Sequence, residues 1–182
     1  MPMSDGPVVG TPVQPDDEAL VAEQMERTPR GMYAIGSRCV SGHPSVVVTE
    51  PRLPNGTPFP TTYYLTCNWL NSRIGTLENS GLMREMEDRL ATDPELAANY
   101  RSAHEAYLAD RAAIARAVGA EVPEIEGISA GGMPERVKCL HVLAAHSLAR
   151  GPGVNLLGDE VLDTIAEMWP AGRCSPSRPT GG

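Results

Sequence analysis

The chain has 182 residues, of which 41% are hydrophobic and only 4% aromatic, and its formal net charge is −8. This length and composition predict one globular domain with a core built mostly from aliphatic side chains. The negative charge disfavours nucleic acid as a partner, because a phosphate backbone would be repelled. We expect a cytoplasmic protein with no membrane partner, since the sequence contains no apolar run of membrane-spanning length and no secretory signal.

The N-terminal region predicts a disordered tail followed by a short helix. Residues 1–15 are rich in proline, glycine and acidic side chains, which bury too little surface to offset the cost of ordering. The globular domain is expected over residues 16–169. Asp16 and Asp17 open a helix, because negative charges are favourable at a helix N-terminus, and Gly31 follows its end.

Three strands are predicted next, over Met32–Cys39, Val46–Val48 and Thr61–Thr66. They are rich in β-branched and aromatic residues, which suit a pleated surface. Residues 41–44 have the composition of a hairpin turn. The pattern indicates a small antiparallel sheet.

Everything after the third strand predicts helix. The proposed helices cover residues 69–78, 81–91, Asp93 to about Val118, Pro134–Arg150 and Asp159–Trp169. Residues 170–182 predict a flexible tail. The fold class is therefore α+β, in which a three-stranded antiparallel sheet packs on one face against several helices and the C-terminal half is helical.

Four segments of the chain resemble a known family. They read LPNGTPFPTTYYLTC, IGTLENSGLM, GGMPERVKCLHVLAAHSLARGPGVN and LGDE. Together they resemble the bacterial domain-of-unknown-function family numbered 501, over roughly residues 20–175. The resemblance implies a bacterial, cytoplasmic setting, and it assigns no activity and no catalytic residue.

The four cysteines, Cys39, Cys67, Cys139 and Cys174, form the first candidate site. Two of them end predicted strands and can meet at one rim of the sheet, where the buried helix carrying Cys139 should pack. Four thiolates suit a zinc ion or an iron–sulfur cluster. No C-x-x-C pair is present, and such wide spacing fits a cluster inserted into a preformed fold better than a zinc ion that nucleates folding. The alternative is that each cysteine packs as a small hydrophobic residue.

Histidines near the cysteines extend this hypothesis. Cys139 lies inside the predicted helix, and a rotation of 100° per residue places His146 on its face and turns His141 nearly the opposite way. His43 or His146 is an alternative ligand in place of Cys174. The simpler interpretation is that these are core histidines with one hydrogen bond each.

A glycine-rich segment directly before a predicted helix forms the second candidate site. Gly131 and Gly132 precede a predicted helix start at Pro134, and Arg136 and Lys138 follow. Exposed backbone N–H groups, the helix dipole and a guanidinium suit a small anionic ligand. The segment matches neither a Walker A loop nor a Rossmann fingerprint, and a plain helix start with solvated charges is the alternative.

A third, weaker feature is His104, which could pair with Glu105 or Asp110 for acid–base chemistry. Three functions therefore stay open. They are a metal- or cluster-binding protein, a non-enzymatic interaction or regulatory module with structural cysteines, and an enzyme acting on a small anionic substrate. The sequence does not decide whether the protein is an enzyme, and it leaves any protein partner unknown.

Overall fold

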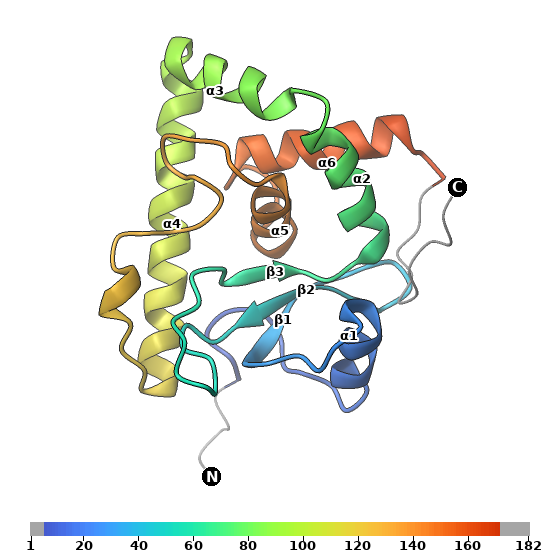
Figure 1. Ribbon diagram of the computed structural model, residues 1–182, viewed down its shortest axis with the longest axis vertical. Helices are drawn as coiled ribbons and strands as arrows, with labels where there is room; N and C mark the ends of the chain where they lie inside the picture. Colours follow the sequence, from blue (N-terminus) through green and yellow to red (C-terminus); the bar gives the residue numbers. More distant parts are fainter. Residues whose placement is uncertain (1–5, 172–182) are drawn as a thin grey trace.

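The computed structural model describes residues 6–171 of the chain (Figure 1). Within that range a three-stranded antiparallel sheet is followed by a run of helices, so the predicted α+β class is confirmed. The strands are β1 (Met32–Arg38), β2 (Pro44–Thr49) and β3 (Tyr63–Leu65). The helices are α1 (Asp17–Met25), α2 (Asn68–Glu78), α3 (Leu82–Thr92), α4 (Pro94–Val118), the short 3-10 turn η1 (Pro123–Ile125), α5 (Leu140–Arg150) and α6 (Leu156–Met168).

Strand β2 is the centre of the sheet and is buried along its whole length. Successive side chains of a strand point to opposite faces. Val46 and Val48 accordingly join the large core that contains α5, whereas Val47 packs with α1 on the other side. The near-continuous valine run follows from this, since a strand covered on both faces needs apolar residues at every position.

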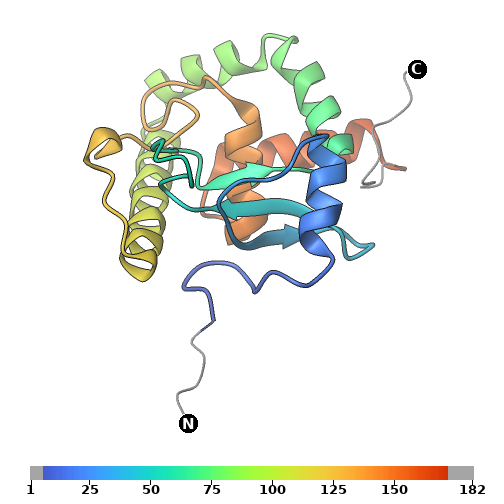
Figure 2. The same cartoon turned by 60° about the horizontal axis from the view of Figure 1, so that its bottom comes forward.

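Helix α1 covers part of the sheet face opposite α5, as the two views of the ribbon show (Figures 1 and 2). Val21 of α1 is fully buried against Ile35 and Val47. The sequence predicted helices on one face only, and this expectation was wrong. The short N-terminal helix supplies a second, smaller apolar layer.

Residues before α1 are also attached to the sheet. Thr11 and Ile35 exchange two backbone hydrogen bonds of 2.9 Å, and Val9 is buried. At the start of α1, the buried Asp17 carboxylate accepts two hydrogen bonds from Arg38, at 2.6 and 2.7 Å. Part of the segment expected to be a disordered tail therefore pairs with the free edge of β1.

The long helix α4 begins and ends where the sequence predicts. The Asp93 side chain accepts hydrogen bonds from the N–H groups of Glu95 and Leu96, both at 3.1 Å, and Pro94 occupies the first helical position. This arrangement satisfies two N–H groups that have no partner inside the helix. Helix α6 begins three residues earlier than predicted, because Asn155 caps it by accepting the N–H of Gly158.

Helix α5 begins at Leu140, not at Pro134 as predicted. The preceding loop uses its own backbone groups, since Arg136 N–H donates to Gly132 O and Lys138 N–H donates to Gly131 O, each at 2.8 Å. Gly131 and Gly132 have φ of 67° and 94°, a region that favours glycine. The chain therefore makes a compact loop before it becomes helical.

Helices α5 and α6 approach each other closely at Gly158. A Cβ built on Gly158 would collide with the Leu143 carbonyl oxygen and with the Ser147 hydroxyl, both on α5. The same contact is secured by a 3.0 Å hydrogen bond from Ser147 Oγ to the Asn155 carbonyl. This crossing fixes α5 against α6.

None of the helices within residues 6–171 combines the length and the apolar character needed to cross a bilayer.

Candidate metal centre

Three potential metal ligands meet where α2 ends and α5 begins. Glu78 is the last residue of α2, Cys139 is the residue immediately before α5, and His141 is the second residue of α5. Their ligand atoms lie within 4.8 Å of one another, and no other group of three histidine, cysteine or acidic side chains in residues 6–171 does so. We call Glu78, Cys139 and His141 the ligand triad.

The distances within the ligand triad are close to those that a tetrahedral metal ion imposes. His141 Nδ1 lies 3.9 Å from Cys139 Sγ and 3.0 Å from Glu78 Oε1. Zinc–sulfur, zinc–nitrogen and zinc–oxygen bonds of about 2.3, 2.05 and 2.1 Å place tetrahedral ligands about 3.6 Å (S to N) and about 3.4 Å (N to O) apart. Both observed separations differ from these values by less than half an ångström, which small side-chain rotations can close.

Two backbone contacts hold the triad in this orientation. The Nε2 atom of His141 lies 3.2 Å from the carbonyl oxygen of Asn71, one helical turn into α2, and donates its hydrogen to that oxygen. Glu78 Oε1 accepts the N–H of Leu140 at 2.8 Å. The first contact directs Nδ1 toward the other two ligands, and the second fixes the carboxylate at the N-terminus of α5, where negative charge is favourable.

The ring of His141 carries a positive charge in the metal-free protein at neutral pH. Burial opposes this charge, but the contact with Cys139 and the negative charge of Glu78 outweigh it and raise the pKa of His141 to about 9. Both ring nitrogens then donate, Nδ1 to Glu78 and Nε2 to Asn71. A metal ion bound at Nδ1 takes the place of that one proton and leaves the Asn71 contact intact.

The ligand triad is open to solvent on one side. The side chains of His141 and Glu78 retain 29% and 24% of their exposure, and Cys139 is half-buried. Three protein ligands with access to solvent leave one tetrahedral position for water or another molecule.

A family model described as "Protein of unknown function (DUF501)" matches residues 35–163. The chain belongs to the DUF501 family. The matched region of this DUF501 protein runs from β1 into α6 and contains all three residues of the ligand triad. No curated protein and no solved structure is significantly similar to the chain.

In this DUF501 structure only one of the predicted cysteine ligands within residues 6–171 belongs to the ligand triad. Cys39 follows β1 and the buried Cys67 precedes α2, so both lie at the same rim of the sheet, as expected. Cys67 is, however, 11 residues from Glu78, or about 16 Å along the axis of α2 at 1.5 Å per residue. Cys139 is the one cysteine in the triad, and Cys174 lies outside the described residues.

The two histidines of α5 have the reverse of their predicted roles. The prediction counted 100° per residue from Cys139, which requires that residue to be helical. Cys139 is instead extended, with φ −153° and ψ 110°, so the helical projection does not apply to it. His141 therefore joins Cys139, whereas His146 is fully buried farther along α5, where its Nδ1 lies 3.3 Å from the Asn155 amide nitrogen.

The glycine-rich loop already holds a carboxylate of its own chain. Glu87 of α3 accepts hydrogen bonds from Arg136 Nε and from the Val137 N–H, both at 2.9 Å. The backbone N–H groups of Arg136 and Lys138 are used within the loop. The anion site at Gly131, Gly132, Arg136 and Lys138 stays a prediction, and Glu87 already takes one donor of the Arg136 guanidinium.

His104 has a different partner from those predicted. Its Nδ1 lies 2.7 Å from Ser129 Oγ, and burial lowers its pKa. Asp110 instead accepts a 2.6 Å hydrogen bond from the Tyr63 hydroxyl and pairs with Arg150 at 3.3 Å. These residues tie α4 to β3 and α5.

The residue that sequence reasoning missed is Glu78. It precedes His141 by 63 residues, and no local spacing connects the two. The one local signal was its place as the last residue of a predicted helix, and nothing in the sequence indicates that this end lies beside Cys139 and His141.

Proposed function

We propose that this DUF501 protein binds a zinc ion through Cys139, His141 and Glu78, with the fourth coordination position open. The proposal replaces the four-cysteine arrangement predicted from the sequence. It keeps Cys139 and exchanges the other thiolates for an imidazole and a carboxylate.

The observation that carries the proposal is the orientation of the His141 ring. Metal-binding histidines usually donate their second ring N–H to a carbonyl or carboxylate, which fixes the tautomer and directs the other nitrogen to the metal. In this protein Nε2 donates to Asn71 O, and Nδ1 faces Glu78 Oε1 and Cys139 Sγ. While Nε2 donates to Asn71 O, a neutral ring would turn the Nδ1 lone pair toward the Glu78 carboxylate at 3.0 Å, and a proton or a metal ion at Nδ1 removes this repulsion.

The chemistry of the donors favours zinc. One thiolate, one imidazole and one carboxylate form a borderline-soft set that suits zinc better than magnesium or calcium, which prefer oxygen ligands. An iron–sulfur cluster usually takes four cysteine thiolates, and the triad contains one. Of the two cofactors predicted from the sequence, a zinc ion and an iron–sulfur cluster, the zinc ion therefore fits the triad better.

The open position defines what such a site can do. Zinc held by three protein ligands lowers the pKa of a bound water to about 7 and polarises carbonyl or phosphoryl groups. Zinc sites of the closed, structural type have four protein ligands instead. The partial exposure of His141 and Glu78 supports the open type.

The test is a competition titration with a chromophoric chelator. We expect the wild-type chain to bind one zinc ion, and Cys139→Ser or His141→Ala to weaken that binding at least about 100-fold, because removing even an outer-sphere partner costs 10–100-fold. The affinity loss is measured directly from the chelator absorbance.

The matched control is Cys39→Ser, which removes a half-buried thiol outside the triad. Its zinc affinity should equal that of the wild type. A loss in Cys39→Ser as large as that in Cys139→Ser would restore the four-cysteine arrangement and contradict the triad.

A further inference from the structure

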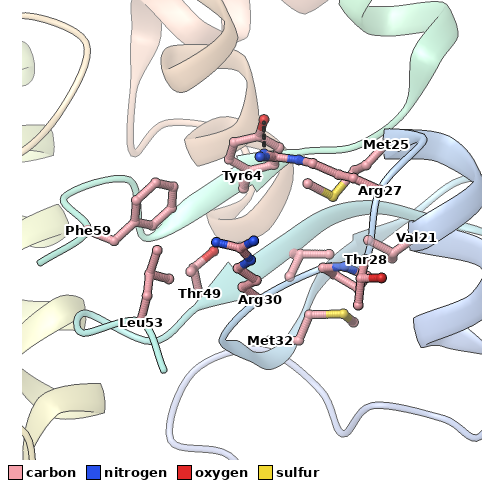
Figure 3. Close-up of a pocket in the computed structure, with 12 residues that line it drawn as sticks. Val21, Met25, Arg27, Thr28, Arg30, Met32, Thr49, Leu53, Phe59 and Tyr64 are labelled. Atoms are coloured by element: carbon pink, nitrogen blue, oxygen red, sulfur yellow. Dashed lines mark hydrogen bonds between the residues drawn. The ribbon is translucent and has the colours of Figure 1, made fainter. Parts of the chain in front are cut away.

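A pocket lies on the sheet face that α1 only partly covers (Figure 3). Helix α1 forms one wall, the loop after β2 forms the opposite wall, and the sheet forms the floor. The volume is about 120 Å³, comparable with an engineered cavity of about 150 Å³ that binds benzene. The pocket is separate from the ligand triad, which lies between α2 and α5.

Most of the side chains that line the pocket are apolar, and two of them are methionines. Val47 of β2 is among the lining residues. Met25 and Met32 line the side toward α1, and Leu53 and Phe59 line the far side. Flexible methionine side chains adapt to ligands of different shape. This lining suits a ring or a short aliphatic chain.

Two arginines beside the pocket have no carboxylate partner in the part of the chain that the structure describes. Arg27 and Arg30 line it from the segment that joins α1 to β1. Arg27 donates a hydrogen bond of 3.4 Å to the Tyr64 hydroxyl, and neither arginine forms an ion pair with any residue in the range 6–171.

Ion pairs neutralise several other arginines of residues 6–171. The chain has 23 acidic and 15 basic residues. Arg38, Arg52, Arg89, Arg136 and Arg150 are all paired with carboxylates. Two unneutralised guanidinium groups beside an apolar pocket are therefore complementary to a ligand with an apolar body and an anionic head.

We propose that this pocket binds a small amphipathic carboxylate, with a single ring or a short alkyl chain in the apolar interior and its carboxylate between Arg27 and Arg30. A guanidinium donates two parallel hydrogen bonds to a carboxylate, which fixes both position and orientation. The apolar body rests on Val47 between the methionines and Phe59. The proposal does not depend on the metal site.

The test uses 3-phenylpropionate as the probe and the intact chain labelled with ¹³C at the methionine methyl groups. We expect saturable binding that shifts the Met25 and Met32 methyl signals. The signals of Met86 and Met133, which are buried in the main core, should not move. The neutral analogue 3-phenylpropanol should bind at least tenfold more weakly, because it cannot form the charge-assisted hydrogen bonds.

The variant pair separates specific recognition from general charge attraction. Arg27→Gln with Arg30→Gln should weaken 3-phenylpropionate binding at least tenfold. Arg84→Gln with Arg101→Gln, which removes the same charge from exposed positions on α3 and α4, should leave it unchanged. All four side chains are exposed, so both variants are expected to fold.

The proposal would be overturned by absence of binding, by equal binding of the acid and the alcohol, or by equal losses in the two double variants. Shifts at Met86 or Met133 in place of Met25 and Met32 would also overturn it. 3-Phenylpropyl phosphate binding more tightly than the acid would overturn the assignment of a carboxylate head.

Discussion

Substitution of Gly158 by alanine is expected to lower the free energy of unfolding by about 3–4 kcal/mol, a large effect for one methyl group. The added Cβ would collide with the backbone carbonyl of Leu143, which cannot move without shifting α5. The gain of up to about 1 kcal/mol that alanine brings to a helix does not offset this overlap. Denaturant-induced unfolding measures the change.

Gly75 provides the matched control, because it is also a helical glycine but lies on α2 with nothing within 4 Å of a Cβ. Gly75→Ala should stabilise the protein by about 0.5–1 kcal/mol through the loss of backbone freedom in the unfolded chain. If Gly158→Ala behaves like Gly75→Ala, then α5 and α6 are not in the close contact described above, and the placement of Cys139 and His141 by α5 loses its support.

Acidification from pH 7 to pH 4 is expected to remove about 3 kcal/mol of stability through His146 alone. The His146 ring is fully buried between Tyr63 and Tyr107, with ring centroids 5.6 and 5.1 Å away. Burial, assisted by the positive charge of Arg150 and opposed by Asp159, lowers its pKa from 6.5 to about 4. Between these two values the unfolded chain binds the proton and the folded chain does not, so the free energy of unfolding falls as the pH falls, by about 1.4 kcal/mol per unit.

The measurement is the free energy of unfolding against pH for the wild type and for His146→Gln. Carboxylates whose pKa values are lowered, such as Asp17 and Glu87, contribute equally to both proteins and cancel in the comparison. The variant should show the shallower slope between pH 4 and pH 6.5, whatever its stability at neutral pH. Equal slopes, or an imidazole of His146 that titrates near 6.5 in an NMR experiment, would show that the ring is not buried in its neutral form.

Elements with local signals were predictable from the sequence. The Asp93–Pro94 pair specifies the start of α4 through side-chain capping and a fixed proline φ, and neither effect depends on the rest of the fold. The valine run of β2 and the end of α2 likewise coincide with their predicted positions. β3 is shorter than predicted, since pairing with β2 extends only over Tyr63–Leu65.

The start of α5 was not predictable, because Pro134 has the same local signature as a proline at the first position of a helix. Contacts distant in sequence decide the outcome there. Glu87 of α3 binds the N–H of Val137 and the side chain of Arg136, which stabilises a loop where the local signal favours a helix. The wrong helix start also led to the wrong choice of histidine ligand, since the orientation of His141 relative to Cys139 depends on whether Cys139 is helical.

The ligand triad was predictable only in part. Cys139 was selected from residue type and from its place on a buried helix. Glu78 enters the site through the packing of α2 on α5, which periodicity and composition do not specify. Apolar residues that line such an interface indicate that two helices pack, but not which end of one lies beside which end of the other.

The central claim is that Cys139, His141 and Glu78 bind a metal ion, and the cobalt(II) absorption spectrum tests it most directly. Cobalt(II) substitutes for zinc, and a coordinated thiolate adds a sulfur-to-cobalt charge-transfer band in the near ultraviolet. We predict that the reduced wild-type chain develops this band and saturates at one equivalent, that Cys39→Ser retains it, and that Cys139→Ser loses it. A band that persists in Cys139→Ser, or a wild-type chain that develops none, would contradict the account.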